Sequence, residues 1–137
     1  MKINFKLFFI LVGLTVIFSS CRTSAPRLDY QALARASVLL GIDINLEDDH
    51  KLYLEAADWI GAPYRGGGDS KRGTDCSGMV YQIYRKVYRI QVPRNTEELK
   101  NKSNKVAKRN LKEGDLVFFS SNRSRKRVAH VGIYLKS

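Results

Sequence analysis

Residues 61–86, GAPYRGGGDSKRGTDCSGMVYQIYRK, decide the fold, and Cys76 lies near their centre. Pro63 and the three glycines at 66–68 exclude regular secondary structure before Asp69. After Cys76, apolar residues recur at the spacing of one helix face: Met79, Val80, Ile83 and Val87. The stretch therefore predicts a glycine-rich loop that leads into a helix, with Cys76 in the first helical turn.

The position of Cys76 favours a chemical role for its thiol. We expect Thr74 or Asp75 to cap the helix. The first turn of a helix has unpaired N–H groups and the positive end of the dipole, which together favour an anion. A thiol at this place is favoured as the thiolate, which is the nucleophilic form. The alternative is a small buried hydrophobic residue, which is the usual role of a single cysteine.

The first twenty residues have the pattern of an export signal. A basic start precedes the apolar run 7–18, which is too short to span a bilayer, since spanning needs about 20 residues. Two serines then precede Cys21. Small residues directly before a cysteine resemble a bacterial lipoprotein signal, in which that cysteine is lipidated and becomes the first residue. Ordinary secretion with cleavage near Ser20 is the alternative.

The cysteine count supports the same interpretation. The chain has two cysteines, which in an exported protein would normally suggest a disulfide. If Cys21 carries lipid, Cys76 is left as a free thiol in an oxidising compartment. Because such a thiol is a liability unless it is used, this arithmetic strengthens the prediction of a nucleophile.

Three segments follow from these boundaries: a signal peptide at 1–20, a polar tether at 21–27 and one small domain at 28–137. The formal net charge is +11, and loss of the two lysines in the signal peptide leaves +9. A strongly basic exported protein suggests anionic partners, such as cell-wall carboxylates or the phosphates of envelope lipids. No base-stacking or helix-turn-helix pattern is present, so nucleic acid is not an expected partner.

The rest of the domain predicts helices followed by strands. Helices are expected at 28–40 and 51–60 with a helical turn at 96–100, and strands at 116–119 and 128–135 on either side of a basic loop, 120–127. On the second strand, His130 shares a face with Gly132 and Tyr134. A buried structural histidine is the usual alternative, but the chain offers no other strong base to pair with Cys76. The acidic link 43–49 is expected to be a solvated turn, with weak calcium binding as its alternative.

Five short motifs occur in a characteristic order: APYRGG at 62–67, DCSG at 75–78, PRNT at 93–96, GDLVFF at 114–119 and HVGIY at 130–134. In this order, behind a lipoprotein-like signal, they resemble the NlpC-type family of papain-like cell-wall cysteine peptidases. The resemblance covers about residues 52–135. It implies an α+β papain-like domain with N-terminal helices packed on an antiparallel sheet. It also implies hydrolysis of peptidoglycan stem peptides, typically between D-glutamate and a diamino acid, without a metal or other cofactor.

The resemblance also implies roles for single residues. Cys76 would attack the carbonyl as a thiolate, and His130 would act as its base and then protonate the leaving amine. The backbone N–H of Cys76 would be an oxyanion donor. The Tyr64 hydroxyl would face the nucleophile, while Asp75 and Ser77 would help to hold a polar end of the stem peptide.

One departure from the family concerns the third catalytic group. The family orients its histidine with a polar residue on the following strand, but this sequence ends seven residues after His130. We therefore expect that a further segment has been lost or left out and that this form is a weak enzyme with an incomplete sheet. The rival function is a non-catalytic lipoprotein that binds cell-wall peptides. In both cases we expect a location in the bacterial cell envelope, anchored through Cys21 on the periplasmic side of the outer membrane.

Overall fold

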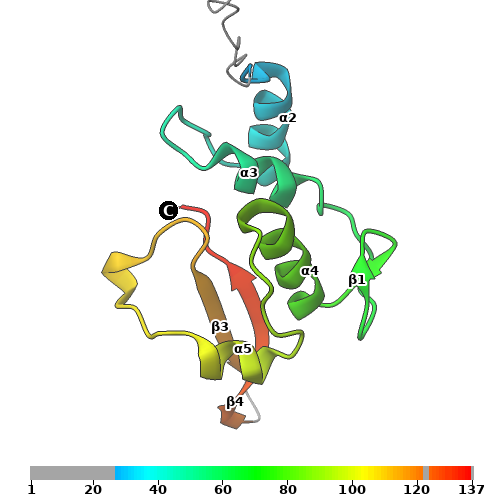
Figure 1. Ribbon diagram of the computed structural model, residues 1–137, viewed down its shortest axis with the longest axis vertical. Helices are drawn as coiled ribbons and strands as arrows, with labels where there is room; N and C mark the ends of the chain where they lie inside the picture. The colour runs from blue at the N-terminus through cyan, green and yellow to red at the C-terminus, as the bar shows by residue number, and fades with distance from the viewer. Residues whose placement is uncertain (1–26, 122–123, 137) are drawn as a thin grey trace, which may run out of the picture.

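The computed structural model describes residues 27–121 and 124–136. Its elements are α2 (Tyr30–Leu40), α3 (His50–Ala57), β1 (Asp69–Ser70), β2 (Gly73–Thr74), α4 (Cys76–Ile83), η2 (Tyr84–Tyr88), α5 (Thr96–Lys102), η3 (Lys108–Asn110), β3 (Leu116–Ser121) and β4 (Ser124–Ile133). Helices α2 and α3 lie at one end, α4 runs through the middle, and the β3–β4 hairpin packs beside α4 (Figure 1). Among these residues, no helix is long and apolar enough to cross a membrane.

The two N-terminal helices begin at aspartate caps. Asp29 accepts a hydrogen bond from the N–H of Ala32, and Asp49 accepts one from the N–H of Leu52. These carboxylates satisfy backbone donors that a helix start otherwise leaves without partners. Gly41 ends α2 in the left-handed region, with φ of 68°. Both expected helices are therefore confirmed, although α3 ends at Ala57 rather than at residue 60.

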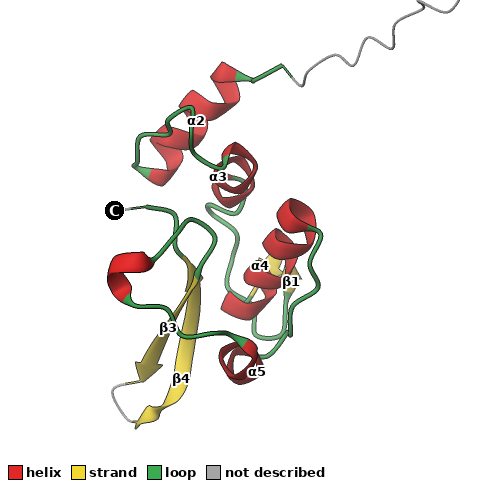
Figure 2. Cartoon of the chain, turned by 60° about the vertical axis from the view of Figure 1, so that its left-hand side comes forward, coloured by secondary structure: helices red, strands yellow, loops and turns green. Residues whose placement is uncertain are grey.

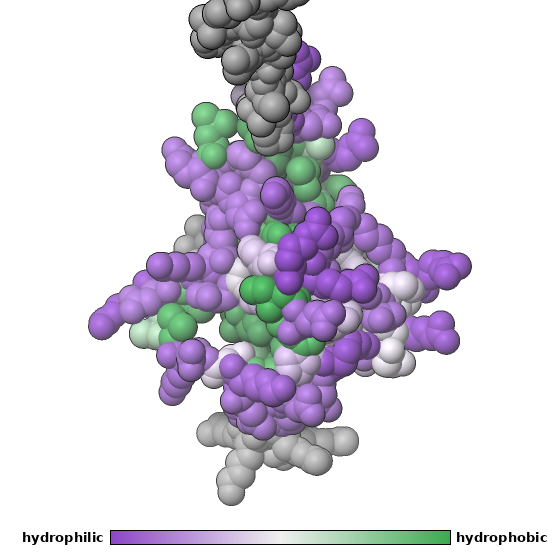
Figure 3. Space-filling view, in the orientation of Figure 1, coloured by the Kyte–Doolittle hydropathy of each residue, from purple (hydrophilic) through white to green (hydrophobic). Residues whose placement is uncertain are grey.

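Helix α4 is the central element because it contributes to both hydrophobic clusters of the core. One cluster joins Ile83 to Leu52, Tyr53 and Trp59, and the other joins Val80 to Leu99 and Val131. Burying one such side chain stabilises the fold by about 1.5–3 kcal/mol. Figure 3 shows hydrophilic side chains over most of one face of the molecule, with hydrophobic residues gathered near its centre.

The helix does not continue regularly to Val87, as its apolar spacing predicts. After Ile83 it widens into the π-helical turn η2, which ends where Arg89 adopts a φ of 61°. Tyr84 and Tyr88 of this turn lie next to the segment before β3, where the Tyr84 hydroxyl donates to the carbonyl oxygen of Gly114. The rings of Tyr84 and Tyr88 pack edge to face, with centroids 5.4 Å apart.

Strands β3 and β4 form an antiparallel hairpin whose register shifts between Phe119 and Ser120 and again between Ser120 and Ser121. Phe119 pairs with His130, but the next residue, Ser120, pairs with Val128, so Ala129 is an extra residue in β4. Such a bulge bends the strand and changes the direction of nearby side chains. The structure starts β4 at Ser124, so part of the segment expected as a basic loop belongs to the strand. Figure 2 shows α5 between the hairpin and the lower end of α4.

Candidate active site

Cys76 is the first residue of α4, as the sequence predicts, and Asp75 is the cap. The Asp75 backbone is extended, and its Oδ1 accepts a hydrogen bond of 2.7 Å from the N–H of Gly78. Within the described part of the chain, the N–H of Cys76 has no hydrogen-bond partner. This N–H is therefore available to an oxygen atom of a ligand, as the start of a helix allows.

The Asp75 carboxylate also joins the helix to the glycine-rich loop. Its Oδ2 accepts a 2.7 Å hydrogen bond from the N–H of Gly67, and its Oδ1 accepts one of 3.1 Å from Arg94. Burial is the largest single influence and favours the neutral acid, but it is outweighed by the hydrogen bonds from Gly78, Gly67, Arg94 and Ser77. Together they hold the pKa of Asp75 below its ordinary value. The charged carboxylate is thus part of the framework of the site.

Arg94 has a structural role that its place in the PRNT motif does not predict. Its guanidinium donates to Asp75 and to Ser77 Oγ, each at 3.1 Å, and to the carbonyl oxygens of Gly67 and Gly68, at 3.2 and 3.0 Å. Arg94 and Ser77 are 17 positions apart in sequence, so no local pattern could have paired them. Arg94 therefore connects the glycine-rich loop to the start of α4.

The Cys76 side chain is partly buried and lies against the second hydrophobic cluster. Its Sγ is 3.9 Å from the hydroxyl oxygen of Thr96, the first residue of α5. Sulfur is a weak hydrogen-bond partner as a thiol, but a thiolate is an anion that attracts a hydroxyl donor. The thiol therefore has an apolar side and one polar neighbour.

His130 lies on β4, directly after the bulge at Ala129, and it is exposed. Its ring lies beside the ring of Phe119, with centroids 6.1 Å apart. The next residue, Val131, is buried in the cluster against which Cys76 packs. Because successive strand residues point to opposite faces, the exposed His130 ring lies on the other face of β4, beside Phe119. Among the described residues, no hydrogen bond joins the imidazole to the thiol. Hydrogen bonds between catalytic residues often become short only when substrate binds, so the lack of one among the described residues is compatible with a catalytic pair. The catalytic roles of Cys76 and His130 stay predictions.

The other residues proposed from the sequence have different surroundings. The Tyr64 side chain is 81% exposed, while its backbone forms a bridge to Thr74 that brings the chain before the loop next to the start of α4. Ser77 is only 5% exposed, and its hydroxyl donates to the carbonyl oxygen of Arg94 at 2.7 Å. The substrate contacts of Tyr64, Asp75 and Ser77 stay predictions. The Asn95 side-chain oxygen accepts hydrogen bonds from the N–H groups of Glu97 and Glu98 and so caps α5.

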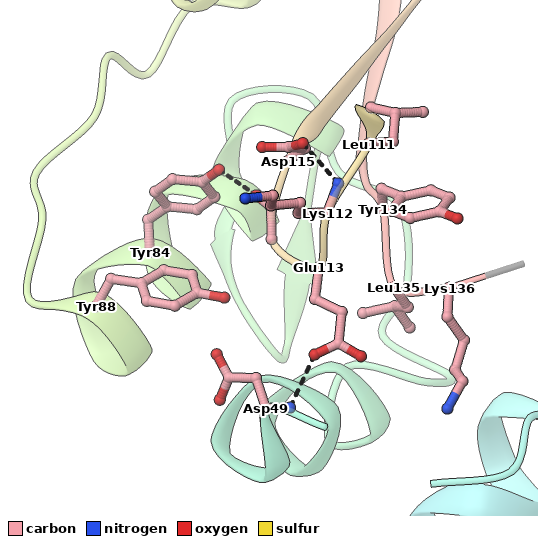
Figure 4. Close-up of a pocket in the computed structure, with 11 residues that line it drawn as sticks. Asp49, Tyr84, Tyr88, Leu111, Lys112, Glu113, Asp115, Tyr134, Leu135 and Lys136 are labelled. Carbon is pink, nitrogen blue, oxygen red and sulfur yellow. Dashed lines mark hydrogen bonds between the residues drawn. The ribbon is translucent and has the colours of Figure 1, made fainter. Parts of the chain in front are cut away.

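A cavity of about 680 Å³ lies away from Cys76, between η2 and the segments before β3 and after β4. Figure 4 shows Tyr84 and Tyr88 on one side of it and Glu113 in its interior. Burial raises the pKa of Tyr84 to about 12, so this phenol stays neutral. In the described ranges, no group of three or more His, Cys, Asp or Glu residues is placed to hold a metal ion.

Comparisons with known proteins agree with the geometry. A probable endopeptidase NlpC homolog of Haemophilus influenzae is 31% identical over 152 residues, which cover 95% of this chain and 80% of the relative. The murein DD-endopeptidase MepS/murein LD-carboxypeptidase of Escherichia coli K12 is 37% identical over 91 residues, covering 66% of this chain and 47% of the relative. The gamma-DL-glutamyl hydrolase of Bacillus subtilis is 41% identical over 87 residues, covering 63% of this chain and 21% of the relative.

A solved structure and a family model give the same assignment. The crystal structure of the NlpC/p60 domain of the peptidoglycan hydrolase SagA matches with a TM-score of 0.55 and 30% identity, covering 69% of this chain and 75% of that one. Residues 61–137 match the model of the NlpC/P60 family. The described residues form helices and two small antiparallel sheets, which agrees with an α+β fold. The chain therefore belongs to the NlpC/P60 family and has its α+β papain-like fold.

Proposed function

We propose that this protein is a peptidoglycan hydrolase that cleaves stem peptides with Cys76 as its nucleophile. The observation that carries the proposal is the place of Cys76 at the first position of a capped helix, with a backbone N–H that has no partner among the described residues. Relatives whose names include murein endopeptidase and gamma-DL-glutamyl hydrolase support this class of substrate.

The proposed reaction proceeds through an acyl-enzyme. His130 accepts the thiol proton, the Cys76 sulfur bonds to the carbonyl carbon, and the carbonyl oxygen becomes an oxyanion that accepts a hydrogen bond from the N–H of Cys76. One such donor contributes about 10²–10³ in rate. His130 then gives its proton to the leaving amine as the C–N bond breaks, and water hydrolyses the thioester. The chemistry uses no metal or other cofactor.

We propose the bond between D-glutamate and the diamino acid as the one that is cleaved. The name of the Bacillus subtilis relative supports a glutamyl bond, whereas the name of the Escherichia coli relative supports a DD cross-link. The two bonds give different products. Cleavage after D-glutamate leaves a disaccharide dipeptide, whereas cleavage of a DD cross-link converts dimers into intact monomers.

The location belongs to the proposal as well. Cys21 lies outside the described residues, and the short apolar run and small residues before it support a lipid anchor. Such an anchor would hold the protein in the bacterial envelope, on the periplasmic side of the outer membrane, within reach of the wall.

The test is a digest of purified monomeric and cross-linked muropeptides, read by mass spectrometry. Wild type should release disaccharide dipeptide, and Cys76→Ala should lose about 10⁶-fold in rate, as removal of the nucleophile does in a serine triad. Far-ultraviolet circular dichroism of both proteins controls for folding. If dimers are converted to monomers and no dipeptide is released, the cleaved bond is the DD cross-link and not the glutamyl bond. Undiminished cleavage by Cys76→Ala would end the thiol mechanism.

A non-catalytic protein that binds wall peptides is the second candidate. The observation that favours it is the ring of His130 beside Phe119, with no hydrogen bond to Cys76 among the described residues. Alkylation separates the two candidates, because a thiolate reacts quickly near about pH 6 and a neutral thiol does not. An inert Cys76 together with muropeptide binding would favour the binding protein.

A further inference from the structure

Residues 94–99, here called the bridge segment, contact both sides of the proposed catalytic pair. The segment begins with Arg94, continues into α5 and ends at Leu99, which is buried in the cluster with Val80 of α4 and Val131 of β4. Figure 2 shows α5 next to both α4 and the hairpin. The segment thus connects the helix that carries Cys76 to the strand that carries His130.

On the nucleophile's side, two residues of the bridge segment act at different points. Arg94 holds Asp75, Ser77 and the glycine-rich loop, and so fixes the start of α4. Thr96 places its hydroxyl oxygen 3.9 Å from the Cys76 sulfur. A hydroxyl at this place can donate to a thiolate, which favours the charged form and one side-chain rotamer.

On the other side, Glu97 reaches β4 next to its bulge. Its Oε1 accepts a 2.9 Å hydrogen bond from the backbone N–H of Val128, two positions before His130. A bulge disrupts the ladder of strand hydrogen bonds, so a backbone donor there needs another partner. A carboxylate is a strong acceptor because the bond is assisted by its charge. Glu97 therefore holds the strand at the place where its direction changes, just before His130.

We propose that the bridge segment positions both members of the Cys76–His130 pair, Thr96 by its contact with the thiol and Glu97 by its bond to β4. The proposal rests on the proposed function. Both are positioning residues, since neither forms a bond with substrate. Successive residues of one short helix thereby set the distance between nucleophile and base, which catalysis tolerates only within about 0.5 Å.

Thr96 is tested by the pH dependence of alkylation. With Cys21→Ser, Cys76 is the only thiol in the chain, and its rate with iodoacetamide can be followed across pH. Thr96→Val keeps the shape but removes the hydroxyl, so the midpoint should rise by about half a pH unit or more. Thr96→Ser should restore it. The charged or titratable groups on the segments around Cys76 include Asp75 and Arg94, which pair with each other, Glu97, which binds Val128, and His130 on β4. The others on α5, Glu98, Lys100 and Lys102, are exposed to solvent.

The positioning role of Glu97 is tested by comparing substitutions of Glu97 with a substitution of Glu98. Glu97→Leu removes the acceptor, Glu97→Gln keeps one, and Glu98→Leu is the matched control, because Glu98 is exposed and its side chain has no hydrogen bond among the described residues. Glu97→Leu should speed hydrogen exchange at the Val128 amide about tenfold and lower kcat about tenfold with little change in KM. Glu97→Gln should recover most of both losses, and Glu98→Leu should match wild type.

A third comparison asks whether Glu97 acts through His130. If it does, Glu97→Leu should move the alkylation midpoint in the same direction as His130→Ala, and the double variant should move it no further. Unchanged midpoints in folded Thr96→Val and Glu97→Leu would overturn the proposal, as would equal effects of Glu97→Leu and Glu98→Leu. Alkylation and hydrogen exchange need no substrate, so they test the positioning roles of Thr96 and Glu97 even if the protein cleaves no muropeptide. Such a lack of cleavage would refute the proposed function alone.

Discussion

The Asp75 carboxylate shows how one residue can connect several parts of a site. It caps the helix that begins at Cys76, accepts the N–H of Gly67 and pairs with Arg94. A residue with three such partners connects the loop, the helix and the segment before α5. The fold therefore stabilises the charged form of this carboxylate, and the free energy of unfolding should depend on pH as the carboxylate is protonated.

The pH dependence of protein stability should show whether Asp75 is charged in the folded protein. Because the pKa of Asp75 is lowered in the folded protein, its ionised form stabilises the fold above the unfolded value of about 3.9, and this contribution is lost as pH falls through the folded pKa. Asp75→Asn keeps a good cap but has no charge. The urea midpoint of this variant should lie below that of wild type at about pH 7, and the gap should shrink toward pH 3. A gap that is constant with pH would contradict this explanation.

At the scale of elements, the close approach of α4 to the glycine-rich loop sets the shape of the site. A Cβ on Gly78 would overlap the carbonyl oxygen of Gly68 and lie 2.9 Å from Thr74 Oγ1. The helix can pack so tightly only because position 78 has no side chain. This contact places the loop beside the start of the helix, where Arg94 then fastens it.

The contact predicts an effect opposite to helix propensity. Gly→Ala within a helix normally stabilises by about 1 kcal/mol. At position 78 it should instead destabilise by about 1–3 kcal/mol, because either the loop or the helix must move. Gly66→Ala is the matched control, since a Cβ there meets no atom within 4 Å. Chemical denaturation measures the free energy of unfolding of both variants. Equal values would show that the loop can move away from the new side chain at position 78 without a cost in stability.

At the scale of the whole molecule, positive charge is the dominant feature. The chain carries 24 Lys and Arg residues against 13 Asp and Glu. Six of the basic side chains lie exposed between Leu99 and β3: Lys100, Lys102, Lys105, Lys108, Arg109 and Lys112. They form the described part of the basic rim that we expect to attract wall carboxylates.

Binding to insoluble peptidoglycan should weaken steeply as salt rises, because the Debye length falls from about 8 Å at 0.15 M to about 3 Å at 1 M. Lys105→Glu with Lys108→Glu should reduce pull-down at low salt. Arg35→Glu with Lys51→Glu, on exposed positions of α2 and α3, makes the same change in net charge elsewhere. If both pairs reduce binding equally, net charge rather than the rim is responsible, and salt-independent binding would point to the peptide site.

The proposed anchor makes a separate prediction. Cys21→Ser removes the atom that would be acylated, so the mature protein should move from the membrane fraction to the soluble envelope fraction. Ultracentrifugation and immunoblotting of both fractions measure the change. Continued sedimentation with membranes would show that some other part of the chain holds the protein there.

The sequence alone determined the features that depend on local patterns. Apolar periodicity located α2, α3 and α4, the expected cap at Thr74 or Asp75 placed Cys76 at a helix start, and a run of strand-forming residues located β3. The ordered motifs indicated the family, which the comparisons confirm. These features depend on residues a few positions apart, whose spacing and side-chain preferences are present in the unfolded chain.

Only the tertiary structure decided how the parts of the site are held together. Arg94 bonds to Ser77 across 17 positions and Glu97 bonds to Val128 across 31. The widened turn after Ile83 contains Tyr84, which bonds to the Gly114 segment 30 positions away, and the bulge before His130 lies in the hairpin that packs against α4. Such contacts exist only after the chain has closed long loops, so no local pattern encodes them. The proposal that Cys76 is the nucleophile therefore rests on local sequence, whereas the position of Cys76 relative to His130 is a property of the folded chain.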